Sequence, residues 1–203
     1  MPEQHHHPLH GDQNTQNFLN KIAFLDSDTR QKQLPPLAIL QPAAIEPTDR
    51  VLDMGAGTGY LAIPAAKQTK ETVFALDLDP RMLAILRTKA QMEQLPNLQP
   101  LQGNLTAIPL PDNAVEVALA SLILHEVEDL PLVLSQTKRV LKPGGRFLCL
   151  EYEKEESALQ GPPLSIRIPS AKMKQELELA GFSSIEKKYL QPGIYLLLAH
   201  NRA

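Results

Sequence analysis

Short apolar runs alternate with amphipathic stretches along most of this chain. The runs at residues 51–52, 72–77, 98–101, 114–120 and 146–152 have the length and composition of strands, most of them buried on both faces. Apolar residues between these runs recur every three or four positions, as expected for helices that pack on a sheet. Two last runs, 182–190 and 194–200, flank Gln191-Pro192-Gly193 and predict an antiparallel hairpin. The pattern therefore predicts an α/β fold.

Two amphipathic stretches precede the first strand. The first covers residues 15–25, and the second covers 28–45 with a new helix beginning near Pro35-Pro36. Near the other end of the chain, Ser170 is expected to cap a helix that Gly181 ends. Residues 1–14 are polar and hold four of the six histidines, so we expect a flexible tail before a single domain of residues 15–203, with metal binding by the tail as the lesser alternative.

Composition narrows the function classes. The 203 residues carry a net charge of −3, which argues against a nucleic-acid surface. The single cysteine, Cys149, lies in an apolar run and is expected to be a buried thiol. No run has the length of a membrane span, so we expect a cytoplasmic protein.

The most informative segment is residues 50–61, RVLDMGAGTGYL. A short strand ends at Asp53, and Gly55, Gly57 and Gly59 then allow a sharp turn against a ligand. A helix is expected at about 60–67, with its free N–H groups at the loop. A dinucleotide fingerprint would need a small residue where Tyr60 stands, so an oxidoreductase is a weaker interpretation of this segment.

The spacing Asp53-x-Gly55-x-Gly57-x-Gly59 resembles motif I of the class I S-adenosylmethionine (SAM) methyltransferases. Leu-His-Glu at 124–126 and RVLKPGGRF at 139–147 are similar to segments of the type 11 and ubiquinone-biosynthesis members of that family. The resemblance implies a three-layer Rossmann-like fold with a mostly parallel seven-stranded sheet in the order 3-2-1-4-5-7-6 and an antiparallel last strand. It also implies that the helices of residues 15–47 lie over the cofactor as a cap, although simple packing is an equal alternative.

The resemblance implies a cofactor site for SAM and its product S-adenosylhomocysteine (SAH). Asp53 suits the cationic cofactor, and Asp77, which ends the second strand, suits the ribose hydroxyls. Asn104 stands where the family usually has Asp, and its side-chain oxygen can still accept a hydrogen bond from adenine. The complete expected set is Asp53, Gly55, Ala56, Gly57, Gly59, Asp77, Leu78, which would pack on adenine, Asn104, Leu105 and Ser121.

The candidate catalytic residues are His125, as a base or an orienting group, and Tyr152, in the substrate pocket. A structural role for His125 is an equal alternative. The resemblance implies methyl transfer to a small-molecule acceptor by direct in-line displacement. We expect no bound metal, because the sequence shows no convincing cluster of carboxylates, and a monomer or homodimer. A non-catalytic protein that binds SAM or SAH for regulation or assembly is the alternative, because a fold does not imply an activity.

Overall fold

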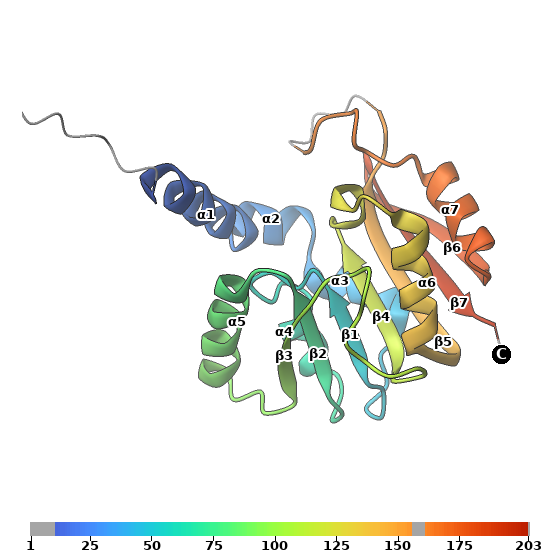
Figure 1. The fold of residues 1–203 in the computed structure, drawn as a ribbon, viewed down its shortest axis with the longest axis horizontal. Coiled ribbons are helices and arrows are strands. Elements are labelled where there is room, and N and C mark those ends of the chain that lie inside the picture. The colour runs from blue at the N-terminus through green and yellow to red at the C-terminus, as the bar shows by residue number, and fades with distance from the viewer. Residues whose placement is uncertain (1–10, 156–160, 203) are drawn as a thin grey trace, which may run out of the picture.

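The computed structural model describes residues 11–155 and 161–202. A seven-stranded sheet forms its centre, in the order β3-β2-β1-β4-β5-β7-β6 (Figure 1). β7 runs antiparallel to both of its neighbours, and the other pairs are parallel, which confirms the predicted sheet. The strands are β1 (Val51–Met54), β2 (Val73–Asp77), β3 (Leu98–Gln102), β4 (Val115–Ser121), β5 (Leu141–Tyr152), β6 (Phe182–Gln191) and β7 (Ile194–Asn201).

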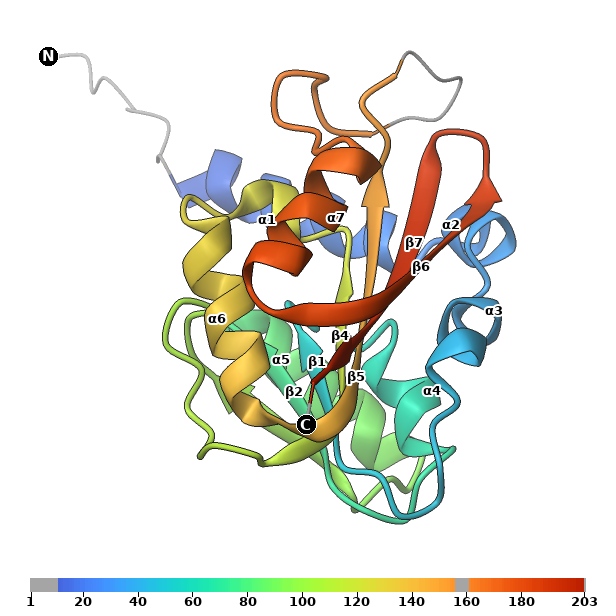
Figure 2. The same ribbon diagram turned by 90° about the vertical axis from the view of Figure 1, so that its right-hand side faces the viewer.

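Helices cover both faces of the sheet (Figure 2). One face packs on α3 (Pro36–Leu40), α4 (Ala62–Ala66) and α5 (Pro80–Met92). The other face packs on α6 (Leu130–Val140) and α7 (Ser170–Leu179). β1 is buried at every position, which explains why its sequence is apolar on both faces and not alternating.

The N-terminal segment lies beside the glycine-rich loop (Figure 1). It consists of α1 (Gly11–Leu25) and α2 (Asp28–Gln33), and α1 begins four residues earlier than expected. Asp26 ties the segment to the body, because one carboxylate oxygen accepts from Thr58 Oγ1 (2.6 Å) and Lys89 Nζ (2.7 Å). The Tyr60 hydroxyl donates to the backbone carbonyl of Leu34. The break between α2 and α3 falls at Pro35-Pro36, as predicted. The histidine cluster of residues 5–10 lies outside the described residues.

Three local predictions were wrong. Pro169, not Ser170, is the N-cap of α7, and Glu153 Oε1 accepts the Ser170 N–H (2.9 Å) in place of a local side chain. α4 begins at Ala62 and not at Tyr60, because the chain is still turning through the glycine loop. β5 begins at Leu141 rather than Arg146, with an irregularity in its pairing to β4 over the intervening residues.

Cys149 is fully buried in β5, as expected. Within the two described ranges, no helix combines the length and the apolarity that crossing a membrane requires.

Candidate active site

The glycine loop connects β1 to α4 in a conformation that depends on its glycines. Gly55, Gly57 and Gly59 have φ values of +71°, +53° and +97°, in the region that side chains disfavour. The N–H groups of Gly55 and Ala56 both donate to the Leu76 carbonyl (2.8 and 2.9 Å), which fixes the loop to the end of β2. The loop is therefore held in place by the backbone of the neighbouring strand.

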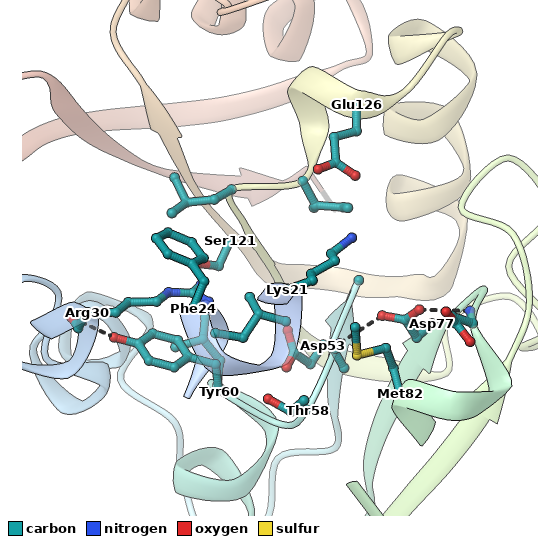
Figure 3. Close-up of a pocket in the computed structure, with 18 of the residues that line it drawn as sticks. Lys21, Phe24, Arg30, Asp53, Thr58, Tyr60, Asp77, Met82, Ser121 and Glu126 are labelled. Carbon is teal, nitrogen blue, oxygen red and sulfur yellow. Dashed lines mark hydrogen bonds between the residues drawn. The ribbon is translucent and has the colours of Figure 1, made fainter. Parts of the chain in front are cut away.

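A cavity of about 440 Å³ opens beside this loop, at the carboxyl ends of β1, β2 and β4 (Figure 3). This is the edge where open α/β sheets bind ligands. Eight of the twelve residues proposed from the sequence line the cavity: Asp53, Gly55, Ala56, Gly57, Asp77, Ser121, His125 and Tyr152. The tertiary structure brings these eight together from four segments of the chain.

The other four residues proposed from the sequence do not line the cavity. Gly59 is internal to the loop, where an added Cβ would lie 2.3 Å from Leu86 Cδ1. Leu78 is 64% exposed, and Leu105 packs against the core. The Asn104 side-chain oxygen accepts from the Thr106 N–H and hydroxyl (both 2.9 Å), so it stabilises its own turn.

Two acids at the strand ends give the cavity a negative wall. The pKa of Asp53 is raised to about 7, mainly by burial and also by the charge of Asp77, whereas the Ala62 N–H and Arg30 oppose the increase. Asp77 accepts from the N–H groups of Gly57 (2.8 Å) and Asp79 (2.9 Å), and it still lines the cavity. Each carboxylate oxygen has further acceptor capacity. The two acids therefore suit a ligand with a cationic group and hydroxyl donors.

The same two acids limit how many loop N–H groups a ligand can use. Asp77 occupies the Gly57 N–H, and Asp53 takes that of Ala62 at the start of α4. The free N–H groups expected at the start of the helix are thus partly satisfied within the protein. The carboxylates, more than the backbone donors, determine which ligand charge this wall accepts.

His125 faces the cavity and is held by an acid that the sequence analysis did not identify. Its Nδ1–H donates to Oε2 of Glu151 in β5 (2.8 Å), and both side chains are almost fully buried. Burial lowers the pKa of His125, but the hydrogen bond and charge of Glu151 outweigh this, so the pKa lies above its ordinary value. Because Nδ1 is engaged, Nε2 is the nitrogen available to a ligand.

Tyr152 follows Glu151 and forms the wall next to the histidine. The rings of His125 and Tyr152 meet edge to face with centroids 6.0 Å apart. The Arg167 guanidinium lies over the Tyr152 ring at 5.2 Å, and an added Cβ on Gly161 would contact the same ring at 2.7 Å. The described part of the loop after β5 therefore borders the cavity, at Gly161 and Pro162.

The N-terminal segment contributes a wall that the sequence analysis described only as a cap. Four of its side chains line the cavity: Lys21, Phe24, Leu25 and Arg30. Arg30 is 7% exposed, and a basic residue in a polar stretch carries no local sign of burial. Glu151 had a detectable signal, since it is an acid inside an apolar strand. Among the described residues, no group of three or more His, Cys, Asp or Glu is arranged to hold a metal ion.

Comparison with known proteins agrees with this geometry. A family model described as a methyltransferase domain, of type 11, matches residues 52–149, which run from β1 into β5. A crystal structure of a SAM-dependent methyltransferase from Aquifex aeolicus superposes with a TM-score of 0.82 and 27% identity, covering 89% of this chain and 97% of that one. The chain is thus similar to the class I methyltransferases of type 11, in sequence over residues 52–149 and in structure over most of its length. The cofactor of this family is SAM, which the acidic wall suits.

Curated relatives of this chain differ in their acceptors. A demethylmenaquinone methyltransferase of Symbiobacterium thermophilum is 37% identical over 111 residues, which are 53% of this chain and 44% of the relative. A malonyl-[acyl-carrier protein] O-methyltransferase of Halorhodospira halophila is 36% identical over 137 residues, which are 67% of this chain and again 44% of the relative. The chain thus matches less than half the length of each, and the two named acceptors are chemically distinct.

Proposed function

We propose that this protein is a SAM-dependent methyltransferase that acts on a small organic acceptor. The observation that carries the proposal is that one cavity joins the acidic wall of Asp53 and Asp77 to the His125–Glu151 pair. The acidic wall is suited to bind the cofactor, and the histidine is suited to act on the acceptor. When bound, SAM would supply its sulfonium methyl group to a nucleophile in line with the carbon–sulfur bond, which breaks as the neutral thioether SAH leaves.

We assign the cofactor contacts by charge and hydrogen-bonding capacity. Asp53 favours the ammonium group, because a cation beside a buried carboxylate stabilises its ionised form. Asp77 accepts from the ribose hydroxyls through lone pairs that Gly57 and Asp79 leave unused. The main-chain bends at Gly55 and Gly57 let a ligand approach the backbone closely. Leu78, Asn104 and Leu105 contribute less in this arrangement, because they do not line the cavity.

His125 is proposed to accept the proton that the acceptor loses. Glu151 holds the Nδ1–H, so the unprotonated Nε2 is presented to the cavity. The same carboxylate accepts from the Leu124 N–H (2.7 Å), which fixes the short 3₁₀ helix η2 (Leu124–Glu126) that carries the histidine. Tyr152 acts as a wall that orients the acceptor toward this nitrogen. The His125–Glu151 pair supplies a proton acceptor, and the rest of the rate enhancement comes from the proximity and alignment of the cofactor and the acceptor.

The first experiment is calorimetric titration of the protein with SAM and with SAH, followed by a screen of small acceptors for SAH release. We expect both compounds to bind, and at least one acceptor to give SAH and a methylated product. Binding of SAH without turnover of any acceptor would favour the non-catalytic alternative. Failure of both compounds to bind would contradict the proposed function.

Substitution of Asp77 tests the cofactor assignment. We expect Asp77→Ala to weaken SAH binding by about 1.5–3 kcal/mol, because a charge-assisted hydrogen bond is lost. Asp77→Asn keeps an acceptor for the Gly57 N–H, so it separates loss of charge from disorder of the loop. Asp112, whose side chain is 70% exposed and which does not line the cavity, provides the matched control Asp112→Ala. An unchanged SAH affinity in Asp77→Ala would contradict the ribose assignment.

A further inference from the structure

A second cavity, of about 460 Å³, adjoins the first one. Phe24, Arg30, Leu122 and Tyr152 line both, so these four side chains form the boundary between the two spaces. The second cavity lies between the α1–α2 segment and the turn of the β6–β7 hairpin, and none of the glycine-loop residues lines it. Its complete lining is Phe24, Ser27, Thr29, Arg30, Gln33, Leu34, Leu122, Tyr152, Gln191 and Ile194.

The two cavities differ in charge. Four acids and two basic residues line the first cavity, whereas no acid is among the residues that line the second: the acids are Asp53, Asp77, Asp79 and Glu126, and the basic residues are Lys21 and Arg30. Arg30 is the only residue with a formal charge in the described lining of the second cavity. A cationic ligand is therefore favoured in the first space and an anionic one in the second.

Arg30 is buried without the partners that a buried guanidinium normally has. Its side chain runs between the rings of Phe24 and Tyr60, with the guanidinium carbon 5.8 and 4.0 Å from the two ring centroids (Figure 3). Among the described residues, no acceptor lies within hydrogen-bond distance of its Nε or Nη1, although both atoms are inaccessible to solvent. Asp26, an acid on the same segment, is engaged by Thr58 and Lys89.

Gln191, on the opposite side of the second cavity, also has a donor without a hydrogen-bond partner. Its Nε2 amide group is buried and has no acceptor among the described residues. Gln191 is the last residue of β6, at the hairpin turn, and it does not line the first cavity. Two donors from distant segments are thus left unpaired around one space, and buried donors in proteins are normally satisfied. A ligand that offers oxygen acceptors supplies what both side chains lack.

We propose that the second cavity receives the anionic end of the methyl acceptor, while its reacting end reaches His125 in the first cavity, and that Arg30 and Gln191 bind an oxygen of that anionic group, such as a carboxylate, on an otherwise apolar acceptor. The apolar part of the ligand packs on Leu34, Leu122 and Ile194. Arg30 and Gln191 are in this assignment specificity-determining residues, while proton transfer stays with His125. The assignment of the ligand to the methyl acceptor rests on the proposed function, whereas the anion preference of the cavity stands on the geometry alone.

A matched pair of small probes tests the anion preference. Protein saturated with SAH is titrated by calorimetry with 4-butylbenzoate and with the neutral 4-butylbenzamide, which have nearly the same shape. We expect the carboxylate to bind at least about 10-fold more tightly than the amide, because a hydrogen bond to a charged group is stronger than one between neutral groups. Equal affinities, or no binding of the carboxylate, would overturn the proposal.

Two substitutions on α2 assign the preference to one side chain. We expect Arg30→Met to weaken carboxylate binding at least about 10-fold and to change SAH affinity by a clearly smaller factor, because Arg30 lies on the boundary of both cavities. Lys32→Met removes the same charge from an exposed position of the same helix that lines neither cavity, and it is expected to change neither affinity. Weakened SAH binding in Arg30→Met with carboxylate binding intact would assign Arg30 to the carboxylate of the cofactor and overturn the proposal.

Gln191→Leu provides a second variant at the hairpin, should Arg30→Met fold poorly. It is expected to weaken carboxylate binding about 3-fold or more without affecting SAH, and no change would remove Gln191 from the proposal. The two hypotheses also fail in different ways. A protein that binds the carboxylate through Arg30 but binds neither SAM nor SAH would contradict the proposed function and retain the anion site.

Discussion

Asp53 is the residue in which the conflict between folding and ligand binding is clearest. It is fully buried at the end of β1, and burial raises its pKa to about 7. Keeping the proton is thus easier in the folded protein than in the unfolded chain, where a carboxyl group titrates near 3.9. The ionised form that a cationic cofactor requires is therefore unfavourable until the ligand arrives.

This shift predicts how the stability of the free protein depends on pH. Because the pKa of Asp53 is raised on folding, its contribution is fully present below about pH 4 and is lost as the pH rises to about 7. We expect the free energy of unfolding to fall between pH 5 and 7, with Asp53 contributing up to about 1.4 kcal/mol per pH unit. Urea unfolding at several pH values measures this. Asp53→Asn should flatten the curve.

Two controls accompany the Asp53 measurement. Glu116 and Glu153 have lowered pKa values, so they titrate below pH 5 and do not contribute to the change in free energy of unfolding between pH 5 and 7. Saturation with SAH should reduce the pH dependence of the wild type, because the ammonium group favours ionised Asp53. Parallel curves for the wild type and Asp53→Asn would show that Asp53 does not carry the effect.

His125 and Glu151 make a separate prediction about turnover. If Nε2 accepts the proton, His125→Ala should lower kcat by about 10²–10⁴-fold with little effect on SAH affinity. The raised pKa of His125 places the acidic limb of the pH–rate profile above pH 6.5. Glu151→Gln removes the charge that raises this pKa, so the limb should move to lower pH. Loss of SAH binding or of folding in His125→Ala would favour the structural role.

Among the elements, the glycine loop depends on individual residues. Gly59 has a φ of +97°, and an added Cβ would lie 2.3 Å from Cδ1 of the fully buried Leu86. Gly144 also has a positive φ, of +78°, but no atom lies within 4 Å of an added Cβ. The two positions thus share the backbone strain of a substitution and differ in the space available to it.

Alanine at these two positions separates strain from crowding. We expect Gly144→Ala to cost about 1–2 kcal/mol in free energy of unfolding, from backbone strain alone. Gly59→Ala should cost a further 1–3 kcal/mol, because the methyl group overpacks the contact between the loop and α5. Urea unfolding of both variants measures the difference. Equal losses would show that the core around Leu86 adapts to the methyl group.

The cap of α7 illustrates how an element can depend on distant residues. Ser170 has the right residue type for an N-cap, yet the carboxylate of Glu153 accepts its N–H. Glu153 is brought there because β5 ends next to the start of α7. The burial of Glu153 raises its pKa, but the hydrogen bonds from Ser170, Lys154 and Tyr189 outweigh this and lower it overall.

In the whole molecule, only a few contacts hold the N-terminal segment against the cavity. They include polar bonds of Asp26 and Tyr60, the Arg30 guanidinium over the Tyr60 ring, and the stacking of the Arg81 guanidinium on Phe18, 4.1 Å from the ring centroid. The exposed fractions of Leu19 and Phe24 are both 51%, so little apolar surface holds α1 in place. A segment with so few buried contacts opens more readily than the sheet.

Ligand binding should therefore stabilise this segment more than the rest of the molecule. We expect saturating SAH to slow amide hydrogen exchange in residues 15–34 by about 10-fold or more, because Lys21, Leu25 and Arg30 line the cofactor cavity. Exchange in α7, whose residues do not line that cavity, provides the internal reference and should change less. Equal protection of both regions, or none in residues 15–34, would contradict the expected capping role.

The sheet and the glycine loop could be predicted from the sequence, because short windows encode them. The strand of residues 51–54 is apolar at nearly every position, and the alternate glycines after it require a turn with positive φ. The hairpin at Pro192-Gly193 and the helix that begins at Pro80 are set by residues at the turn and the cap themselves. The order of the strands could be predicted because motifs in these same short segments resemble those of a known family.

The partners of the buried polar groups were decided only by the tertiary structure. Glu151 meets His125 because the pairing of β4 with β5 brings together residues 26 positions apart. Arg30 enters the cavity because α2 is fixed at Tyr60. Asn104 does not line the cavity, and its side-chain oxygen accepts from Thr106 instead. Local propensity acts over a few residues, whereas strand register and packing act between distant segments and determine which charges meet.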